Sequence, residues 1–263
     1  MNTKFKALQL KLLQMKRVLI AFSGGVDSTF LLHAAVKTLG RKNVLAVTAV
    51  SETYPKSELK LAKKMLKRTG ARGIFIRTSE LKNSRFASNP RERCFYCKDE
   101  LFKKLSALAK KNKMILLDAT NYSDRTDFRP GRKAAMKWGV KSPIAEAKLT
   151  KDEIRKLSRR FKLPTWDLPA QACLASRIPY GVKISTALLA KIEKGEAFIK
   201  KLGFTNVRIR SHGNIARIEI DKKQFNKLLD GNIRSKIYAC LNKLGWSYVS
   251  ADILGYRTGS LNN

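Results

Sequence analysis

Residues 21–28, Ala-Phe-Ser-Gly-Gly-Val-Asp-Ser, constrain the fold of this chain more than any other segment. An apolar run over residues 17–22 predicts a strand that enters the segment, and residues 28–36 predict a helix that leaves it. The two glycines allow a tight turn and close approach to a ligand, and the N–H groups that open a helix attract anions. The segment is not a Walker loop, because no Gly-Lys-Ser/Thr follows at the required spacing. The segment therefore predicts a phosphate-binding loop of another type, with an ordinary strand–turn–helix connection as the alternative.

Strand and helix patterns alternate after this loop, which favours a doubly wound parallel α/β sheet with helices on both faces. Ligands of such sheets bind outside the carboxyl ends of the strands. We therefore expect Ser51 and Thr120, which follow two of the strands, to share one crevice with the loop. The predicted strands are residues 43–50, 73–78 and 114–118, and the predicted helices are residues 55–69 and 98–111.

The second half of the chain predicts a smaller α/β domain. Residues 142–146 predict a short extended piece, and Thr150 with Glu153 forms a capping box that starts the next helix. Prolines between residues 163 and 181 exclude regular structure and indicate a shaped loop. From residue 182 on, the pattern predicts a helix (185–202), strands (205–210 and 215–220), two helical stretches and a last strand (246–254). We expect domains over residues 1–181 and 182–263, joined by a hinge at residues 179–181.

The charge of the chain is strongly positive. Among 263 residues, 55 are Lys or Arg and 20 are Asp or Glu, which gives a net charge of +35. Such a balance favours polyanionic partners, with tRNA or another nucleic acid first among them. The alternative is a generally lysine-rich surface, because the lysines are spread along the whole chain. No signal peptide or membrane-spanning run is visible, so we expect a cytoplasmic protein without membrane contact.

Three segments carry a resemblance to a known family. Residues 21–28 resemble the SGGxDS loop of the PP-loop ATP pyrophosphatases, which split ATP between its α and β phosphates and adenylylate a substrate oxygen. Residues 118–131, Asp-Ala-Thr-Asn-Tyr-Ser-Asp-Arg-Thr-Asp-Phe-Arg-Pro-Gly, and residues 169–181, Pro-Ala-Gln-Ala-Cys-Leu-Ala-Ser-Arg-Ile-Pro-Tyr-Gly, are similar to LarE proteins. Those are ATP-dependent sulfur transferases that make a pincer nickel cofactor. Ala119 and Ser123 depart from the family, which more often has glycine and aspartate there.

The resemblance implies that ATP adenylylates a carboxylate of a pyridinium mononucleotide, and that sulfur then displaces AMP to give a thiocarboxylate. Asp27 would help to hold Mg²⁺. Four residues match a second phosphate or metal site at LarE subunit interfaces, namely Glu196, Arg208, Arg210 and Glu219. A homo-oligomer is therefore expected, and the alternative for each residue is a solvated strand charge. The resemblance implies ATP contacts at Ser23, Gly24, Gly25, Val26, Asp27, Ser28, Ser51 and Thr120. It implies substrate or phosphate contacts at Asp124, Arg129, Ser176, Arg177, Glu196, Arg208 and Arg210.

The four cysteines bear on the source of sulfur. Cys94 and Cys97 form a CxxC pair without the second pair that a zinc site needs. Cys173 matches the sulfur-giving cysteine of LarE proteins, and Cys240 fits the core of a helix. In some family members the single cysteine is sacrificed and becomes dehydroalanine. In others three cysteines hold a 4Fe-4S cluster that carries an extra sulfide, and this is what we expect at Cys94, Cys97 and Cys173. The alternative is that the CxxC pair binds no metal and is structural.

Two other functions remain open. A tRNA thiolase of the same PP-loop superfamily is favoured by the positive charge, although no extra RNA-binding module is visible. A non-catalytic nucleotide-binding regulator is the second, and the intact loop together with a reactive cysteine argues against it.

Overall fold

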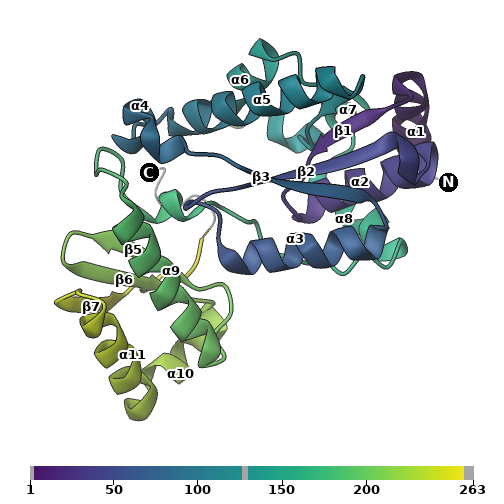
Figure 1. Ribbon diagram of the computed structural model, residues 1–263. Helices are drawn as coiled ribbons and strands as arrows, with labels where there is room; N and C mark the ends of the chain where they lie inside the picture. Colours follow the sequence, from purple (N-terminus) through teal and green to yellow (C-terminus); the bar gives the residue numbers. More distant parts are fainter. Residues whose placement is uncertain (1–2, 126–129, 258–263) are drawn as a thin grey trace. The chain divides into compact units, whose positions relative to one another are not determined.

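The computed structural model describes residues 3–125 and 130–257 (Figure 1). The chain divides into two compact units, which we call unit 1 and unit 2. Unit 1 comprises Met1–Phe86 and Glu92–Leu168, and unit 2 comprises Ala87–Arg91 and Pro169–Asn263. The division therefore follows Leu168, whereas the sequence analysis set the boundary after Gly181.

Unit 1 contains a four-stranded sheet in the order β3-β2-β1-β4, with every neighbouring pair parallel. The central strand β1 has neighbours on both sides, because Val18 pairs with Val44 in β2 and with Ile115 in β4. This arrangement confirms the predicted parallel α/β fold. The strands are β1 (Val18–Ala21), β2 (Val44–Val50), β3 (Arg72–Arg77) and β4 (Ile115–Leu117).

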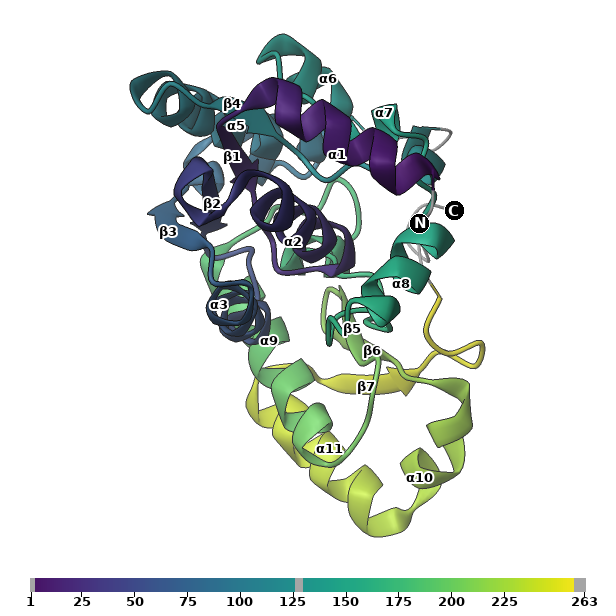
Figure 2. The ribbon, with the colours of Figure 1, turned by 90° about the vertical axis from the view of Figure 1, so that its right-hand side faces the viewer.

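Alternating side chains of the central strands pack on opposite faces of the sheet. Val18 and Ile20 lie in one apolar cluster with α1, α2, α3 and α8, while Leu19 lies in another with α5 and α6. Figure 1 shows α5 and α6 on one side of the sheet, and Figure 2 shows α1 beside α2. The helices that pack on the sheet are α1 (Thr3–Met15), α2 (Val26–Leu39), α3 (Lys56–Thr69), α5 (Arg93–Lys111), α6 (Gly131–Lys137) and α8 (Lys151–Arg160).

Two local predictions in unit 1 need correction. Helix α5 begins at Arg93, five residues before the predicted start, so the CxxC pair lies inside its first turns. Residues 142–146 are not extended; they form the short helix α7 (Pro143–Glu146), which has proline at its first position. The predicted capping box of Thr150 and Glu153 is confirmed at the start of α8. A further short helix, α4 (Ser84–Ala87), ends at the border of the two units.

Unit 2 is a small α/β unit built on a three-stranded sheet in the order β5-β6-β7. Strands β5 and β6 are antiparallel, and β6 and β7 are parallel. Ile209, Ile218 and Trp246 are fully or almost fully buried in this unit. Its elements are α9 (Thr186–Lys201), β5 (Arg208–His212), β6 (Ile215–Glu219), α10 (Phe225–Leu229), α11 (Gly231–Lys243) and β7 (Tyr248–Ala251).

The segment Ala87–Arg91 is joined to the rest of unit 2 by the Asn89 side chain and by backbone hydrogen bonds. The Asn89 amide donates hydrogen bonds to the carbonyl oxygens of Ile178, Pro179 and Val182, at 3.3, 2.7 and 3.0 Å. The backbone N–H of Gly181 donates to the carbonyl oxygen of Asn89. The expected hinge at residues 179–181 is therefore bonded to a segment that precedes it by about 90 residues.

None of the helices in the described residues is long and apolar enough to span a membrane.

Candidate active site

The loop between β1 and α2 can be formed only with glycine at position 24. Gly24 has φ +76°, and a Cβ atom there would lie 2.8 Å from the Cα atom of Ala62 in α3. Gly25 follows as the N-cap of α2 in an extended conformation, without a side chain that caps the helix. The loop therefore brings its backbone close to α3 and leaves the start of α2 open.

The start of α2 offers several hydrogen-bond donors. In the described part of the chain, no hydrogen bond engages four of the backbone N–H groups between residues 24 and 28. The hydroxyls of Ser23 and Ser28 lie 3.1 Å apart, and Ser28 also donates to the carbonyl oxygen of Gly25 at 3.3 Å. Such a set of amides and hydroxyls at a helix N-terminus suits the oxygens of a phosphate. The four N–H groups are those of Gly24, Val26, Asp27 and Ser28.

Asp27 lies in the first turn of α2 and faces a lysine from α8. The Nζ atom of Lys151 is 2.5 Å from Oδ2 of Asp27. The other oxygen, Oδ1, is buried and has no hydrogen-bond partner among the described residues. Because Mg²⁺ takes carboxylate oxygens as ligands, this unsatisfied oxygen fits the expected metal contact. Lys151 could not be predicted as a site residue, since 124 residues separate it from Asp27.

The connection after β4 is stabilised by hydrogen bonds to two of its own carboxylates, those of Asp118 and Asp124. Asp118 accepts hydrogen bonds from the hydroxyls of Thr120 and Ser142, at 2.8 and 2.6 Å. Asp124 and Asn121 are both buried and bond each other's backbone N–H groups. Thr120 and Asp124 thus follow the strand next to β1, as expected, and both are engaged in bonds that shape the connection. Arg129 lies outside the described residues.

The connection after β2 contacts the phosphate-binding loop directly. Ser51 and Thr53 both donate to Oε1 of Glu80, at 2.5 and 2.6 Å, and Glu80 is only 3% exposed. The hydroxyl of Tyr54 donates to the carbonyl oxygen of Ser23 at 2.7 Å. Burial, with a smaller contribution from Glu58, raises the pKa of Tyr54. Of these residues only Ser51 was predicted to lie at the site, because neither Glu80 nor Tyr54 belongs to a recognisable motif.

The cysteines of the expected cluster are divided between the units. Cys94 is exposed and Cys97 half-buried, one helical turn apart in α5 of unit 1. Cys173 is half-buried and immediately precedes the 3-10 turn Leu174–Arg177 of unit 2. Within the described residues, no group of three or more His, Cys, Asp or Glu side chains is positioned to hold a metal ion.

Arg177 fixes the turn that follows Cys173. Its guanidinium donates to the carboxylate of Glu196 at 2.8 and 3.1 Å, and both residues are buried. It also donates to the carbonyl oxygens of Ala172 and Cys173, at 2.6 and 2.9 Å. Burial alone would raise the pKa of Glu196, but the Arg177 charge and hydrogen bonds lower it overall. Ser176 donates its hydroxyl to the carbonyl oxygen of Cys173.

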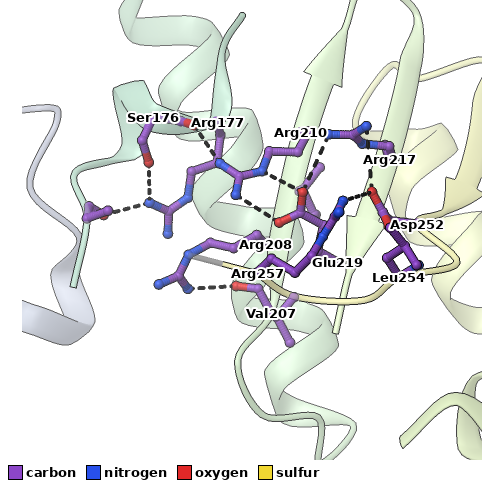
Figure 3. A network of polar contacts seen from close by, with 12 residues as sticks. Ser176, Arg177, Val207, Arg208, Arg210, Arg217, Glu219, Asp252, Leu254 and Arg257 are labelled. Atoms are coloured by element: carbon purple, nitrogen blue, oxygen red, sulfur yellow. Dashed lines mark hydrogen bonds and ion pairs between the residues drawn. The ribbon is translucent and has the colours of Figure 1, made fainter. Parts of the chain in front are cut away.

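A second buried ion pair lies beside this turn (Figure 3). Arg210 pairs with Glu219 through two hydrogen bonds of 3.0 and 2.8 Å, and it donates to the carbonyl oxygen of Ser176 at 2.6 Å. Glu219 is completely buried and also accepts from Arg217. Arg210 is 5% exposed, so the alternative reading of this arginine as a solvated strand charge is wrong.

Arg208 differs from its neighbours in this network. It is 8% exposed, and its hydrogen bonds go to the carbonyl oxygens of Val207 and Ala170, at 2.9 and 3.3 Å. Its guanidinium also lies over the ring of Tyr256. Burial first, and then the charge of Arg177, lowers the pKa of Arg208. Among the described residues no carboxylate hydrogen-bonds to Arg208, although the charge of Glu196 acts on its guanidinium and opposes the lowering of its pKa.

Known proteins are similar to this chain over its whole length. The sequence profile of the NAD synthase family matches residues 3–114. The pyridinium-3,5-bisthiocarboxylic acid mononucleotide synthase of Lactiplantibacillus plantarum is 34% identical over 262 residues, which cover 99% of this chain and 94% of that protein. An uncharacterized protein of Synechocystis is 38% identical over 250 residues, 95% of this chain and 93% of that protein. An uncharacterized protein of Methanocaldococcus jannaschii is 28% identical, with 92% of each chain covered.

Proposed function

Since this chain belongs to the LarE family of PP-loop proteins, we propose that it is an ATP-dependent sulfurtransferase that turns a carboxylate of a pyridinium mononucleotide into a thiocarboxylate. The observation that carries the proposal is the similarity over 99% of the chain to a synthase of such a mononucleotide. The phosphate-binding loop supports the use of ATP. By the family resemblance, the product serves the synthesis of a pincer nickel cofactor.

The first step activates the substrate. A carboxylate oxygen of the mononucleotide attacks the α-phosphorus of ATP, pyrophosphate leaves, and an acyl adenylate forms. The unpaired N–H groups at the start of α2 stabilise the negative charge that collects on pyrophosphate. Asp27 would hold Mg²⁺, which supplies further neutralisation of that charge when bound. Lys151 keeps the Asp27 carboxylate at the loop and adds a positive charge there.

The second step transfers sulfur, and Cys173 takes part in it. In the sacrificial route the Cys173 thiolate attacks the acyl carbon and expels AMP, and β-elimination from the resulting thioester leaves thiocarboxylate and dehydroalanine. We favour the other route, because the CxxC pair lies on one turn of α5 with its thiols half-buried or exposed. A 4Fe-4S cluster would be held by Cys94, Cys97 and Cys173, and when bound it would supply the sulfide.

Unit 2 is proposed to bind the substrate and to shape the cysteine turn. Arg208, which has no hydrogen bond to a carboxylate among the described residues, would contact a phosphate with help from Arg210. Arg177, Glu196 and Ser176 would hold the backbone around Cys173. Asp124 and Arg129 would contact the substrate from the connection after β4. We also propose a homo-oligomer.

The test is a reaction of the purified protein with Mg-ATP, sulfide and a pyridinium dicarboxylate mononucleotide under anaerobic conditions. We expect AMP and pyrophosphate, together with a substrate in which sulfur replaces oxygen. Formation of ADP and phosphate would contradict the proposal. Intact-protein mass spectrometry then separates the two routes, since loss of hydrogen sulfide from Cys173 would show that the cysteine was consumed. Cys240→Ala is the matched control and should keep iron, sulfide and activity.

A tRNA thiolase is the second candidate, because the net charge of +35 favours a polyanion. If the charge reflects composition alone, tRNA binding will be weak and will fall steeply with salt concentration. Binding that persists at physiological salt, with thiolated tRNA bases as product, would favour this candidate instead. In either case we propose a reaction in the cytoplasm, because the four cysteines are too few and too scattered for the disulfide framework of a secreted protein.

A further inference from the structure

The hydrogen bond between Tyr54 and the phosphate-binding loop has no part in the chemistry described so far. Tyr54 lies in the connection between β2 and α3, and its hydroxyl donates to the carbonyl oxygen of Ser23. Ser23 immediately precedes Gly24, the residue whose φ of +76° shapes the loop. The bond therefore acts on the peptide group that joins Ser23 to Gly24.

A trans peptide directs its C=O and its N–H to opposite sides. By binding the carbonyl oxygen of Ser23, Tyr54 holds the N–H of Gly24 on the side away from the tyrosine. That N–H is one of the four that no hydrogen bond engages in the described chain. Glycine tolerates both orientations of the neighbouring peptide, so the loop itself does not prevent this group from flipping. A flip would place a carbonyl oxygen where an N–H donor stood, and it would repel a phosphate.

The position of Tyr54 is itself fixed by a buried carboxylate. Glu80 follows β3 and accepts the hydroxyls of Ser51 and Thr53 on one oxygen, at 2.5 and 2.6 Å. The two hydroxyls are 3.0 Å apart, and Thr53 is buried together with Glu80. Hydrogen bonds to a carboxylate are stronger than those between neutral groups, so this contact holds the residues next to Tyr54 firmly. The raised pKa of Tyr54 keeps its hydroxyl protonated, and therefore a donor.

We propose that Tyr54 is a positioning residue, which keeps the Ser23–Gly24 peptide oriented for phosphate binding, and that Glu80 holds Tyr54 in place. The inference rests on the proposed ATP-dependent activation, because it assigns the orientation of a donor to the leaving pyrophosphate. Its direct consequence is selective. Losing the tyrosine hydroxyl should weaken binding of the phosphates and leave the binding of the nucleoside part unchanged.

The experiment compares Tyr54→Phe with the wild type by calorimetry, using Mg-pyrophosphate and adenosine as separate probes. One lost hydrogen bond should weaken pyrophosphate binding by up to about tenfold, while the Kd of adenosine stays the same. A general loosening of the site would weaken both ligands equally, and that outcome would overturn the inference. Unchanged pyrophosphate binding would overturn it as well. Tyr238→Phe, an exposed tyrosine of α11, is the matched control.

A second variant, Glu80→Gln, keeps the proposal testable if Tyr54→Phe fails to fold. Glu80→Gln keeps the size of the side chain and an acceptor oxygen but loses the charge, so we expect a smaller loss of pyrophosphate affinity than in Tyr54→Phe. If Glu80→Gln loses as much pyrophosphate affinity as Tyr54→Phe, or more, the proposal that Glu80 acts by holding Tyr54 is contradicted. Failure of the wild type to form AMP would refute the proposed function. If the wild type forms AMP and Tyr54→Phe binds pyrophosphate as tightly as the wild type does, only the role of Tyr54 is refuted.

Discussion

The phosphate-binding loop of unit 1 leaves polar groups without partners in the described chain, whereas the arginine network of unit 2 pairs them. The network consists of Arg177 with Glu196 and Arg210 with Glu219. At the loop, four backbone N–H groups have no acceptor in the described chain, and Asp27 has one unsatisfied oxygen. In the network, Arg177 and Arg210 each bind a buried carboxylate through two hydrogen bonds. The first region leaves its donors for a ligand, whereas the second satisfies its charges internally.

The difference follows from the energetics of burial. An unpaired N–H at an open helix end is solvated until a ligand replaces the water, so it costs little. A buried guanidinium or carboxylate without a partner costs several kcal/mol, and pairing offsets that cost. We therefore expect mutations at the loop to affect turnover and mutations in the network to affect stability. Arg208 is the exception in unit 2, because its bonds go to carbonyl oxygens.

The largest effect should come from Asp27→Ala. Loss of the carboxylate removes the expected metal ligand and the partner of Lys151, so formation of AMP should fall by about a thousandfold or more. The midpoint of thermal unfolding should change little, since Asp27 is only partly buried. AMP release measured by chromatography checks the first expectation, and circular dichroism checks the second. If Asp27→Ala formed AMP near the wild-type rate, the proposed difference between the two regions, turnover at the loop and stability in the network, would be wrong.

Glu219→Gln should be the most destabilising change in the network. It leaves the buried Arg210 without a counter-charge, which costs about 3–5 kcal/mol in the free energy of unfolding. Urea denaturation measures this cost. The partly exposed pair of Lys11 and Glu146 supplies the control, since Lys11→Met should cost no more than about 1 kcal/mol. Equal costs at the two pairs would show that burial does not govern the network.

Gly24→Ala should produce an intermediate effect on stability with a loss of ATP binding. The new methyl group meets the backbone of Ala62, and the positive φ adds strain of about 1 kcal/mol or more. Gly213→Ala measures the strain of a positive φ without the steric clash, because Gly213 has φ +60° and open space around its Cβ position. If both variants lose the same free energy of unfolding, the close approach of the loop to α3 is unimportant.

The smallest effect should be the pH dependence contributed by Glu153. Burial alone would raise its pKa, but hydrogen bonds from Lys4 and Thr150 lower it overall. The ionised carboxylate therefore stabilises the fold above its unfolded pKa of about 4.3, and this contribution disappears as the pH falls through the lower folded value. Glu153→Gln should remove less than about 1 kcal/mol at pH 7 and nothing at pH 2. A difference that persists at pH 2 would contradict the assignment.

The sheet and the phosphate-binding loop could be predicted because local sequence determines them. The apolar runs around Val18, Val44 and Ile115 form strands, and Gly24 and Gly25 lie where the backbone needs them. The start of α5 was placed too late, because residues 94–97 form a continuous run of Cys, Phe and Tyr that shows no helical period. Helix α7 was misassigned for a similar reason, since four residues are too few to show a period.

The contacts that complete the site could not be predicted, because they join distant parts of the chain. Lys151 reaches Asp27 across 124 residues, and Glu80 reaches Ser51 across 29. No local pattern encodes such pairs. Arg210 was open to a reading as a solvated charge, because alternation along a strand does not reveal which face is covered. Only the folded chain shows that the guanidinium of Arg210 bonds the carboxylate of Glu219.

The hydrogen bonds of Asn89 set an order of events during synthesis. Asn89 leaves the ribosome 89 residues before Ile178, its partner in unit 2. At the usual pace of translation this delay lasts roughly 4 to 18 seconds, which is long compared with the folding of a small domain. Unit 2 must therefore complete its structure around a segment that was made with unit 1. A fragment that starts at Pro169 would lack Asn89, and the turn from Ile178 to Val182 would lose the amide that binds three of its carbonyl oxygens.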